Sequence, residues 1–153
     1  MFGTKKTPFH VVVKAAFEEA RQRGDRRLGT EHLLLGVLHN PDAARALGVD
    51  PAGARAGLDS LDREALRLLG LDAGPADLPG APRKHPPVPS TALTSSARAV
   101  INQAVKATTM KTRAVEAPRQ LVLALLALGR PDPVAQLIDH LSIDRAAVRG
   151  RLA

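Results

Sequence analysis

The sequence predicts an all-α fold, a pseudo-two-fold bundle of two four-helix repeats joined by a proline-rich linker. Apolar residues recur at the spacing of amphipathic helices, and no stretch shows the alternation of a strand. Aromatic residues make up only 2% of the 153-residue chain, so the core must consist of Leu, Val, Ile and Ala, which suits close-packed helices. In addition, the two halves of the chain align with each other.

This internal alignment is ungapped across two helices and then across two more. A shift of 88 residues places the apolar run 33–38 over 121–126. Beyond that run the shift becomes 94, which a single six-residue length difference in the following loop would explain. We therefore predict an internal duplication within one domain, 1–153. Its parts are repeat one at 7–70, a linker at 71–91 and repeat two at 92–153.

The first helix of repeat one is expected to run from Pro8 to about Arg23 and to stop at Gly24. Thr7 before Pro8 is typical of a helix cap followed by proline at the first helical position. One face of this helix is apolar and should turn inward. That face carries Val12, Val13, Ala16, Phe17 and Ala20.

The stretch 28–38 is the centre of repeat one and combines a turn, a helix cap and a short helix. Gly29 supplies a permissive backbone and Thr30 can cap the helix through its hydroxyl. Glu31 follows in the first turn, where the helix dipole favours a carboxylate. The run LLLGVL is apolar nearly all round, so this helix, ending before Pro41, should be enclosed by others.

Two further helices complete repeat one: a short one near 42–47 and a longer one that starts at Asp50-Pro51 and ends near Gly70. Six prolines within 71–91 then indicate a stiff, extended linker.

Repeat two shows the same succession of starts. We expect Thr94 to open its first helix and Pro118 to lie in the first turn of its central helix. Asp132 and Asp144 should start the last two helices.

The motif Gly29-Thr30-Glu31-His32, followed by Leu-Leu-Leu-Gly and preceded by Glu18-Glu19-Ala20-Arg21, resembles the N-terminal domain of Clp chaperone ATPases, especially the ClpC type. The resemblance covers essentially the whole chain and is weaker in repeat two.

The sequence has no phosphate-binding loop of the form GxxxxGK[ST], so we expect the module without its ATPase. The resemblance implies no cofactor and a non-catalytic module that binds Clp substrates or adaptors. Such a module would act as an adaptor, as a decoy competing with a full-length Clp ATPase, or by docking on a Clp hexamer.

The resemblance also implies a ligand, because some ClpC-type domains recognise phosphorylated arginine through an acidic residue in this motif. Here Glu31 would pair with the guanidinium, while Thr30, Thr7 and nearby helix-start amides would take the phosphate. From local sequence alone, the simpler interpretation of Glu31 is a carboxylate that stabilises a first turn. Repeat two holds Arg119 and Gln120 at the positions of Glu31 and His32. A cation would repel a guanidinium, so at most one site is expected.

A second surface follows from the same resemblance. In related domains, a groove between the first helices of the two repeats binds peptides and cyclic-peptide antibiotics. The matching positions are Phe2, Val13, Leu93, Arg98, Ile101 and Asn102. A purely structural role in the core is an equally good explanation for the two β-branched members of this set, Val13 and Ile101.

Other functions find little support in the sequence. The chain has no Cys, and His32 and His39 lie seven residues apart without the spacing of a metal site. No apolar run is long enough to span a membrane and no signal peptide is evident, so we expect a soluble, cytoplasmic protein.

The charge keeps one alternative open. The net charge is +7, of which +5 lies in 93–153. A basic nucleic-acid-binding protein is the alternative, with arginines 26, 27, 145, 149 and 151 as candidates. The near absence of aromatic residues for base stacking speaks against it.

Overall fold

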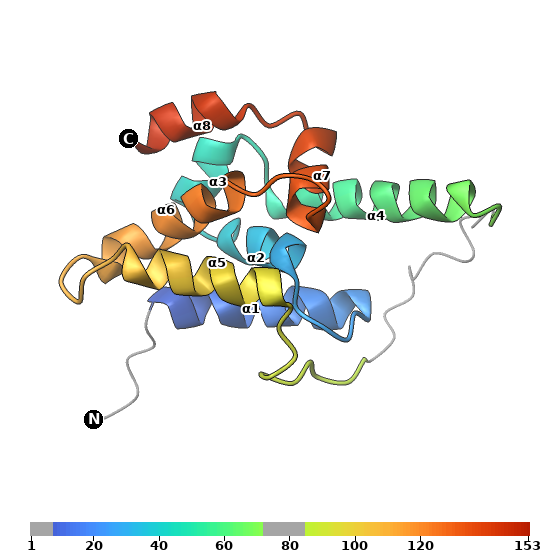
Figure 1. The fold of residues 1–153 in the computed structure, drawn as a ribbon, viewed down its shortest axis with the longest axis horizontal. Coiled ribbons are helices and arrows are strands. Elements are labelled where there is room, and N and C mark those ends of the chain that lie inside the picture. Colours follow the sequence, from blue (N-terminus) through green and yellow to red (C-terminus); the bar gives the residue numbers. More distant parts are fainter. Residues whose placement is uncertain (1–7, 72–84) are drawn as a thin grey trace.

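The computed structural model describes residues 8–71 and 85–153, and within them the fold is all-α (Figure 1). Eight helices follow one another as two sets of four, and the described part contains no strand beyond one isolated bridge. The helices are α1 (Pro8–Arg23), α2 (Thr30–Val37), α3 (Pro41–Leu47), α4 (Pro51–Leu68), α5 (Ser95–Lys106), α6 (Arg113–Leu126), α7 (Pro133–His140) and α8 (Arg145–Leu152). The fold class predicted from the sequence is confirmed.

The core lies around α2 and α6, which contact each other at the centre of the molecule. Their apolar runs are buried on nearly every side, because α1 covers α2 and α5 covers α6. Buried residues of both repeats form one hydrophobic cluster. Complete burial of these leucines is the main stabilising contribution, of the order of 2 kcal/mol for each side chain. The fully buried leucines are Leu28, Leu33, Leu34, Leu35, Leu38, Leu121, Leu125, Leu126 and Leu137.

The helix starts and stops predicted from capping residues are mostly confirmed. The side chains of Asp50, Thr94 and Asp144 each accept a hydrogen bond from the backbone N–H three residues on, at 2.7 to 3.1 Å. Asp132 caps α7 in the same way through the N–H of Val134, at 3.1 Å. Gly24 ends α1 with a φ of 78°, a conformation that favours glycine.

The central helices begin differently from the prediction. Gly29, not Thr30, is the N-cap residue of α2, because the Thr30 hydroxyl turns away toward repeat two. Pro118 lies inside α6, five residues after the first residue, Arg113, so α6 has an additional turn at its start that α2 lacks. At this interior position proline removes the N–H bond to the carbonyl four residues earlier, and its ring crowds that carbonyl.

The length difference between the repeats is also distributed differently from the prediction. The loop after α6 (127–132) is three residues longer than the loop after α2 (38–40), and the remaining extra residues lie at the ends of α6 and α7 and in the next loop. The last helices differ most, since α4 has 18 residues and α8 has 8. As a result the second half of α4 projects beyond the body of the molecule (Figure 1).

Candidate functional site

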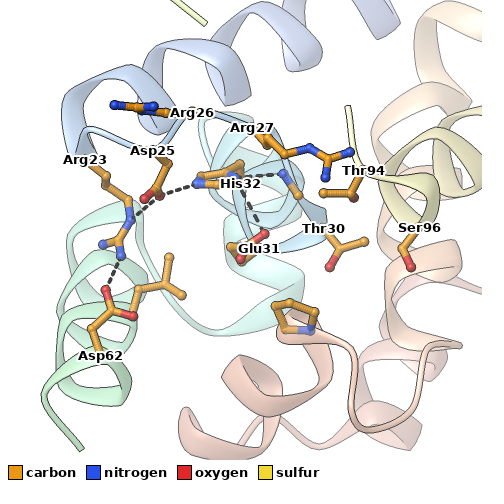
Figure 2. A pocket seen from close by; sticks show the side chains of 13 residues that line it. Arg23, Asp25, Arg26, Arg27, Thr30, Glu31, His32, Asp62, Thr94 and Ser96 are labelled. Atoms are coloured by element: carbon orange, nitrogen blue, oxygen red, sulfur yellow. Dashed lines mark hydrogen bonds and ion pairs between the residues drawn. The ribbon is translucent and has the colours of Figure 1, made fainter. Parts of the chain in front are cut away.

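A cavity of about 450 Å³ lies where the starts of α2 and α5 meet (Figure 2). The loop between α1 and α2 forms one wall, and α4 and α7 contribute Leu58, Asp62 and Pro133. The remaining lining residues are Arg23, Asp25, Arg26, Arg27, Gly29, Thr30, Glu31, His32, Thr94 and Ser96.

A pair of backbone hydrogen bonds holds the two helix starts together. The N–H of Leu28 donates to the carbonyl of Ala92 at 2.8 Å, and the N–H of Thr94 donates to the carbonyl of Leu28 at 2.9 Å. This isolated parallel bridge joins segments 65 residues apart (Leu28 and Leu93). Residue periodicity could not reveal it, because a two-residue pairing has no repeat of its own.

Glu31 folds back over the backbone of Gly29. A Cβ atom on Gly29 would lie 2.0 Å from Glu31 Oε1, so the glycine provides the space for the carboxylate. The side chain of Glu31 is 21% exposed, yet its Oε1 is buried and has no hydrogen-bond partner among the described residues. A buried carboxylate oxygen without a hydrogen bond is costly, so Oε1 is an unsatisfied acceptor of this site, with His32 Nδ1 at 3.5 Å (Figure 2).

His32 and Asp25 fix the loop that carries Glu31. The N–H of Gly29 donates to His32 Nδ1 at 2.9 Å, so Nε2 carries the ring proton and donates to Asp25 Oδ2 at 2.7 Å. Arg23 extends this chain to Asp25, Asp59 and Asp62. Burial opposes the ionisation of Asp25, but the hydrogen bond from His32 and the nearby charges outweigh it and lower the pKa of Asp25. Both ring nitrogens of His32 therefore have structural partners.

The hydroxyl of Thr30 is also fully engaged. It donates to Asp132 Oδ1 and accepts from the N–H of Val134 at 3.3 Å, and Thr30 is only 1% exposed. By contrast, Ser96 is exposed and Thr94 is half-buried at the start of α5. Figure 2 shows Arg27 extending toward Thr94, where it donates to the carbonyl of Leu93 at 3.5 Å. Across the cavity from Glu31, the structure therefore places a helix start and a cation.

The structure brings only some of the predicted residues together. Glu31 and Thr30 line the cavity, whereas Thr7 and Phe2 lie outside the described residues. The described start of α1 lies against the start of α6 instead, where the Arg113 guanidinium is 5.9 Å from the centre of the Phe9 ring.

The cavity also contains two residues that the site prediction from sequence did not include, Thr94 and Ser96. In the sequence, Thr94 was recognisable only as a helix cap.

The residues of the predicted peptide groove have mixed environments. Val13, Leu93 and Ile101 are partly buried and pack against the core, in agreement with the structural interpretation of Val13 and Ile101. Arg98 and Asn102 are exposed on α5. Without Phe2 among the described residues, the groove stays a prediction.

The equivalent position in repeat two has a different geometry. Arg119 binds Glu116 within α6 at 2.9 and 3.1 Å. Because α6 begins at Arg113, the residues that match the start of α2 lie inside a helix, and no free backbone N–H groups point outward there.

The arginines at the end of repeat two make contacts within the chain. Arg149 donates to the carbonyl of Leu126 at 3.2 Å and Arg151 to that of Ala46 at 2.6 Å, and Arg145 pairs with Asp139. The charges of Arg149 and Arg151 thus lie at the ends of α6 and α3, where a cation is favoured, whereas Arg145 links the start of α8 to α7 through its pair with Asp139.

Two general properties complete the description of the site. Within residues 8–71 and 85–153, no three His, Cys, Asp or Glu residues gather closely enough to hold a metal ion. None of the helices in these two ranges combines the length and the apolar character that crossing a bilayer requires.

Comparison with known proteins agrees with the motif in repeat one. The family model described as the Clp repeat N-terminal domain matches residues 6–138. Two curated proteins are similar at 35% identity over 68 residues: the rice chloroplastic chaperone protein ClpC2, and the tomato chloroplastic ATP-dependent Clp protease ATP-binding subunit ClpA homolog CD4B. Each alignment covers 41% of this chain and 7% of the relative, so the chain matches only a small part of either protein.

Proposed function

Because the chain belongs to the family of Clp repeat N-terminal domains, we propose that it is a non-catalytic module that binds protein or peptide ligands of a Clp system. The proposal extends to a ligand, phosphoarginine on a protein, bound in the cavity between the starts of α2 and α5. The observation that carries this choice is the buried, unpartnered Oε1 of Glu31.

A guanidinium group supplies the donors that this carboxylate lacks. Arginine-type ligands bind a carboxylate through two parallel hydrogen bonds, and such binding requires the Glu31 carboxylate to turn away from Gly29, over which it is folded. Asp25 and Asp62 also line the cavity, but both are paired with Arg23, so Glu31 is the acidic group left for a ligand.

The phosphate is assigned to the start of α5. The first N–H groups of a helix and its dipole favour an anion, and Thr94, Ser96 and Arg27 lie beside them. We give this role to α5 in preference to Thr30, whose hydroxyl already has two partners. Thr7 remains a candidate from the resemblance alone.

The biological role that follows is an adaptor, or a decoy that competes with a full-length Clp ATPase for substrates, adaptors or cyclic-peptide antibiotics. Both roles require the same binding surface. Competition for a labelled substrate distinguishes them, because a decoy lowers its degradation by the Clp protease and an adaptor raises it.

Calorimetric titration of phosphoarginine tests the site directly. We expect binding near one equivalent to the wild-type chain, with affinity lowered about tenfold or more in Glu31→Gln, which keeps the size of the side chain and removes its charge. Glu18→Gln, on the exposed side of α1, is the matched control and should bind normally. Free phosphate and unphosphorylated arginine, titrated separately, report on the two ends of the ligand.

A second variant tests the phosphate end. Ser96→Asp places a negative charge at the start of α5, so it should weaken phosphoarginine binding and leave arginine binding unchanged or stronger. Full binding by Glu31→Gln, or two equal binding sites in the wild type, would refute the proposed site.

A further inference from the structure

The ring of His32 lies between two carboxylates of the cavity wall. Its Nε2 is 2.7 Å from Asp25 Oδ2, and its Nδ1 is 3.5 Å from Glu31 Oε1 (Figure 2). The side chain is only 4% exposed and lies in the first turn of α2, next to Glu31. One buried histidine thus lies beside both the carboxylate that fixes the loop and the carboxylate assigned to the ligand.

In its neutral form, the ring leaves Glu31 Oε1 without a hydrogen bond. Nδ1 accepts the N–H of Gly29 at 2.9 Å, so it has no proton to donate to Oε1. The single ring proton is on Nε2 and is donated to Asp25. The tautomer that the loop selects is therefore the reason why Oε1 is unsatisfied.

Protonation of the ring would change the interactions of Nδ1. A protonated Nδ1 is a donor, so it can no longer accept the N–H of Gly29, and the two donors would repel each other. Glu31 Oε1 already lies within ion-pair distance of this nitrogen. A movement of about 1 Å would give a charge-assisted hydrogen bond between them, which would hold the carboxylate in its position over Gly29.

The other charged groups around the ring leave these two carboxylates as its partners. Arg23 at the end of α1 is shared among three acids, Asp25, Asp59 and Asp62. Arg27 extends toward the start of α5, and Arg26 is exposed (Figure 2). Among the lining residues, α5, α6 and α7 add no charge, and Asp132 before α7 is held by the Thr30 hydroxyl. Burial of the ring opposes a charge, whereas a carboxylate at each nitrogen favours it.

We propose that His32 controls the availability of Glu31: the neutral ring leaves the carboxylate free for an arginine-type ligand, and the protonated ring binds it instead. This role depends on the proposed function, in which Glu31 binds the guanidinium of the ligand. Because the proton on Nδ1 and the ligand compete for the same oxygen, affinity falls as pH falls through the titration of the ring. Histidines change charge between about pH 5 and 8, so mild acidification releases the ligand.

Calorimetric titration of phosphoarginine at about pH 8 and about pH 6 tests this competition. We expect the wild type to bind about tenfold more weakly at the lower pH. His32→Asn keeps an acceptor for the N–H of Gly29 but cannot be protonated, so the tenfold difference should disappear. A change due to the ligand's own phosphate would appear equally in both proteins. His140→Asn, exposed at the end of α7, is the control and should show the pH dependence of the wild type.

NMR titration of the histidine rings measures the same coupling without a ligand. Glu31→Gln should lower the midpoint of the His32 titration by about one pH unit, because the protonated ring loses a charged partner. Glu18→Gln, exposed on α1, should leave the midpoint unchanged. A midpoint that Glu31→Gln does not move would overturn the proposal, as would equal affinity of the wild type at both pH values. Absence of binding at either pH would refute the proposed function instead, and the NMR midpoints would still decide whether His32 is coupled to Glu31.

Discussion

At the residue scale, the buried carboxylate of Glu19 shows how this small core holds a charge. Glu19 is 3% exposed and accepts hydrogen bonds from Arg55 Nε and Nη2 at 2.7 and 2.5 Å and from His39 Nε2 at 2.8 Å. It therefore ties α1 to α4 and to the end of α2. Burial opposes its ionisation, but these hydrogen bonds and charges outweigh burial and lower the pKa of Glu19 below its ordinary value of 4.5.

A lowered pKa makes stability depend on pH with a defined sign. The unfolded chain binds a proton at Glu19 more readily than the folded chain, so this contribution is present above about pH 5 and is lost as pH falls through the folded pKa. Glu19→Gln should cost about 2 kcal/mol at neutral pH and a smaller amount at about pH 3. Urea denaturation at both pH values measures this difference.

Glu18→Gln is the control for that experiment, because Glu18 is 51% exposed and pairs only with Arg21 on the same helix. Its effect should stay within about 0.5 kcal/mol at either pH. An equal loss of stability in both variants, or a loss in Glu19→Gln that is the same at low pH, would contradict the role given to the buried pair.

Gly29 gives a residue-scale reason for the Gly-Thr-Glu-His motif. Its φ is −105°, which any residue adopts, so no special backbone conformation requires glycine here. The requirement is space, because the Glu31 carboxylate occupies the position of a Cβ atom. The motif thus combines a residue without a side chain with an acid that folds over it.

At the element scale, α1 and α2 approach closely at Gly36. A Cβ atom on Gly36 would lie 2.6 Å from the carbonyl oxygen of Val12 and 2.9 Å from the nitrogen of Ala16, both backbone atoms that cannot easily move aside. Repeat two has Ala124 at the equivalent position, so this approach belongs to repeat one.

Gly36→Ala should therefore destabilise the protein by about 1–3 kcal/mol, even though alanine is the better helix former. Gly150→Ala in α8 is the matched control, because nothing lies within 4 Å of the new Cβ atom. It should stabilise by about 0.5–1 kcal/mol. Thermal unfolding of the two variants gives the comparison, and a stabilised Gly36→Ala would show that the two helices have room to separate.

The starts of α2 and α6 differ, so the site proposed in repeat one has no structural counterpart in repeat two. The start of α2 is open to the cavity and carries Glu31, whose Oε1 has no hydrogen-bond partner among the described residues. The matching residues of repeat two lie within a longer helix and hold Arg119, paired with Glu116. Helix length and side-chain charge thus both favour a single site.

At the scale of the whole molecule, the repeats are interlocked. Thr30 in α2 binds Asp132 and Val134 of repeat two, Leu28 pairs with the chain before α5, and Arg151 of α8 reaches the end of α3. Because these contacts and the single hydrophobic cluster join both halves, we expect one cooperative folding unit.

Thr30→Val tests this unity. Valine fills the same space without the hydroxyl, and should cost about 1–2 kcal/mol by leaving Asp132 with one fewer donor. Amide hydrogen exchange should show the same loss of protection in α2 and in α6, because global unfolding exposes both. Faster exchange confined to one repeat would indicate two separate units.

Much of the fold could be predicted from the order of residues, because it depends on local chemistry. Residue periodicity predicts the inward faces of the helices. Helix-end preferences predict the end of α1 at Gly24 and the capping by Asp50, Thr94 and Asp144. The start of α6 could not be predicted in this way, since Pro118 is compatible with both a first turn and an interior position. For the site, the motif pointed to Glu31 but not to the residues opposite it.

The order of helices, the duplication and the acidic motif were therefore properties of the sequence, set by interactions between residues a few positions apart. Tertiary structure alone decided that the start of α5 faces Glu31 and that the Thr30 hydroxyl is used within the fold. The physical reason is that these features arise where segments far apart in the chain meet. Backbone pairing at Leu28 and Leu93, close helix approach and burial have no counterpart in local residue spacing.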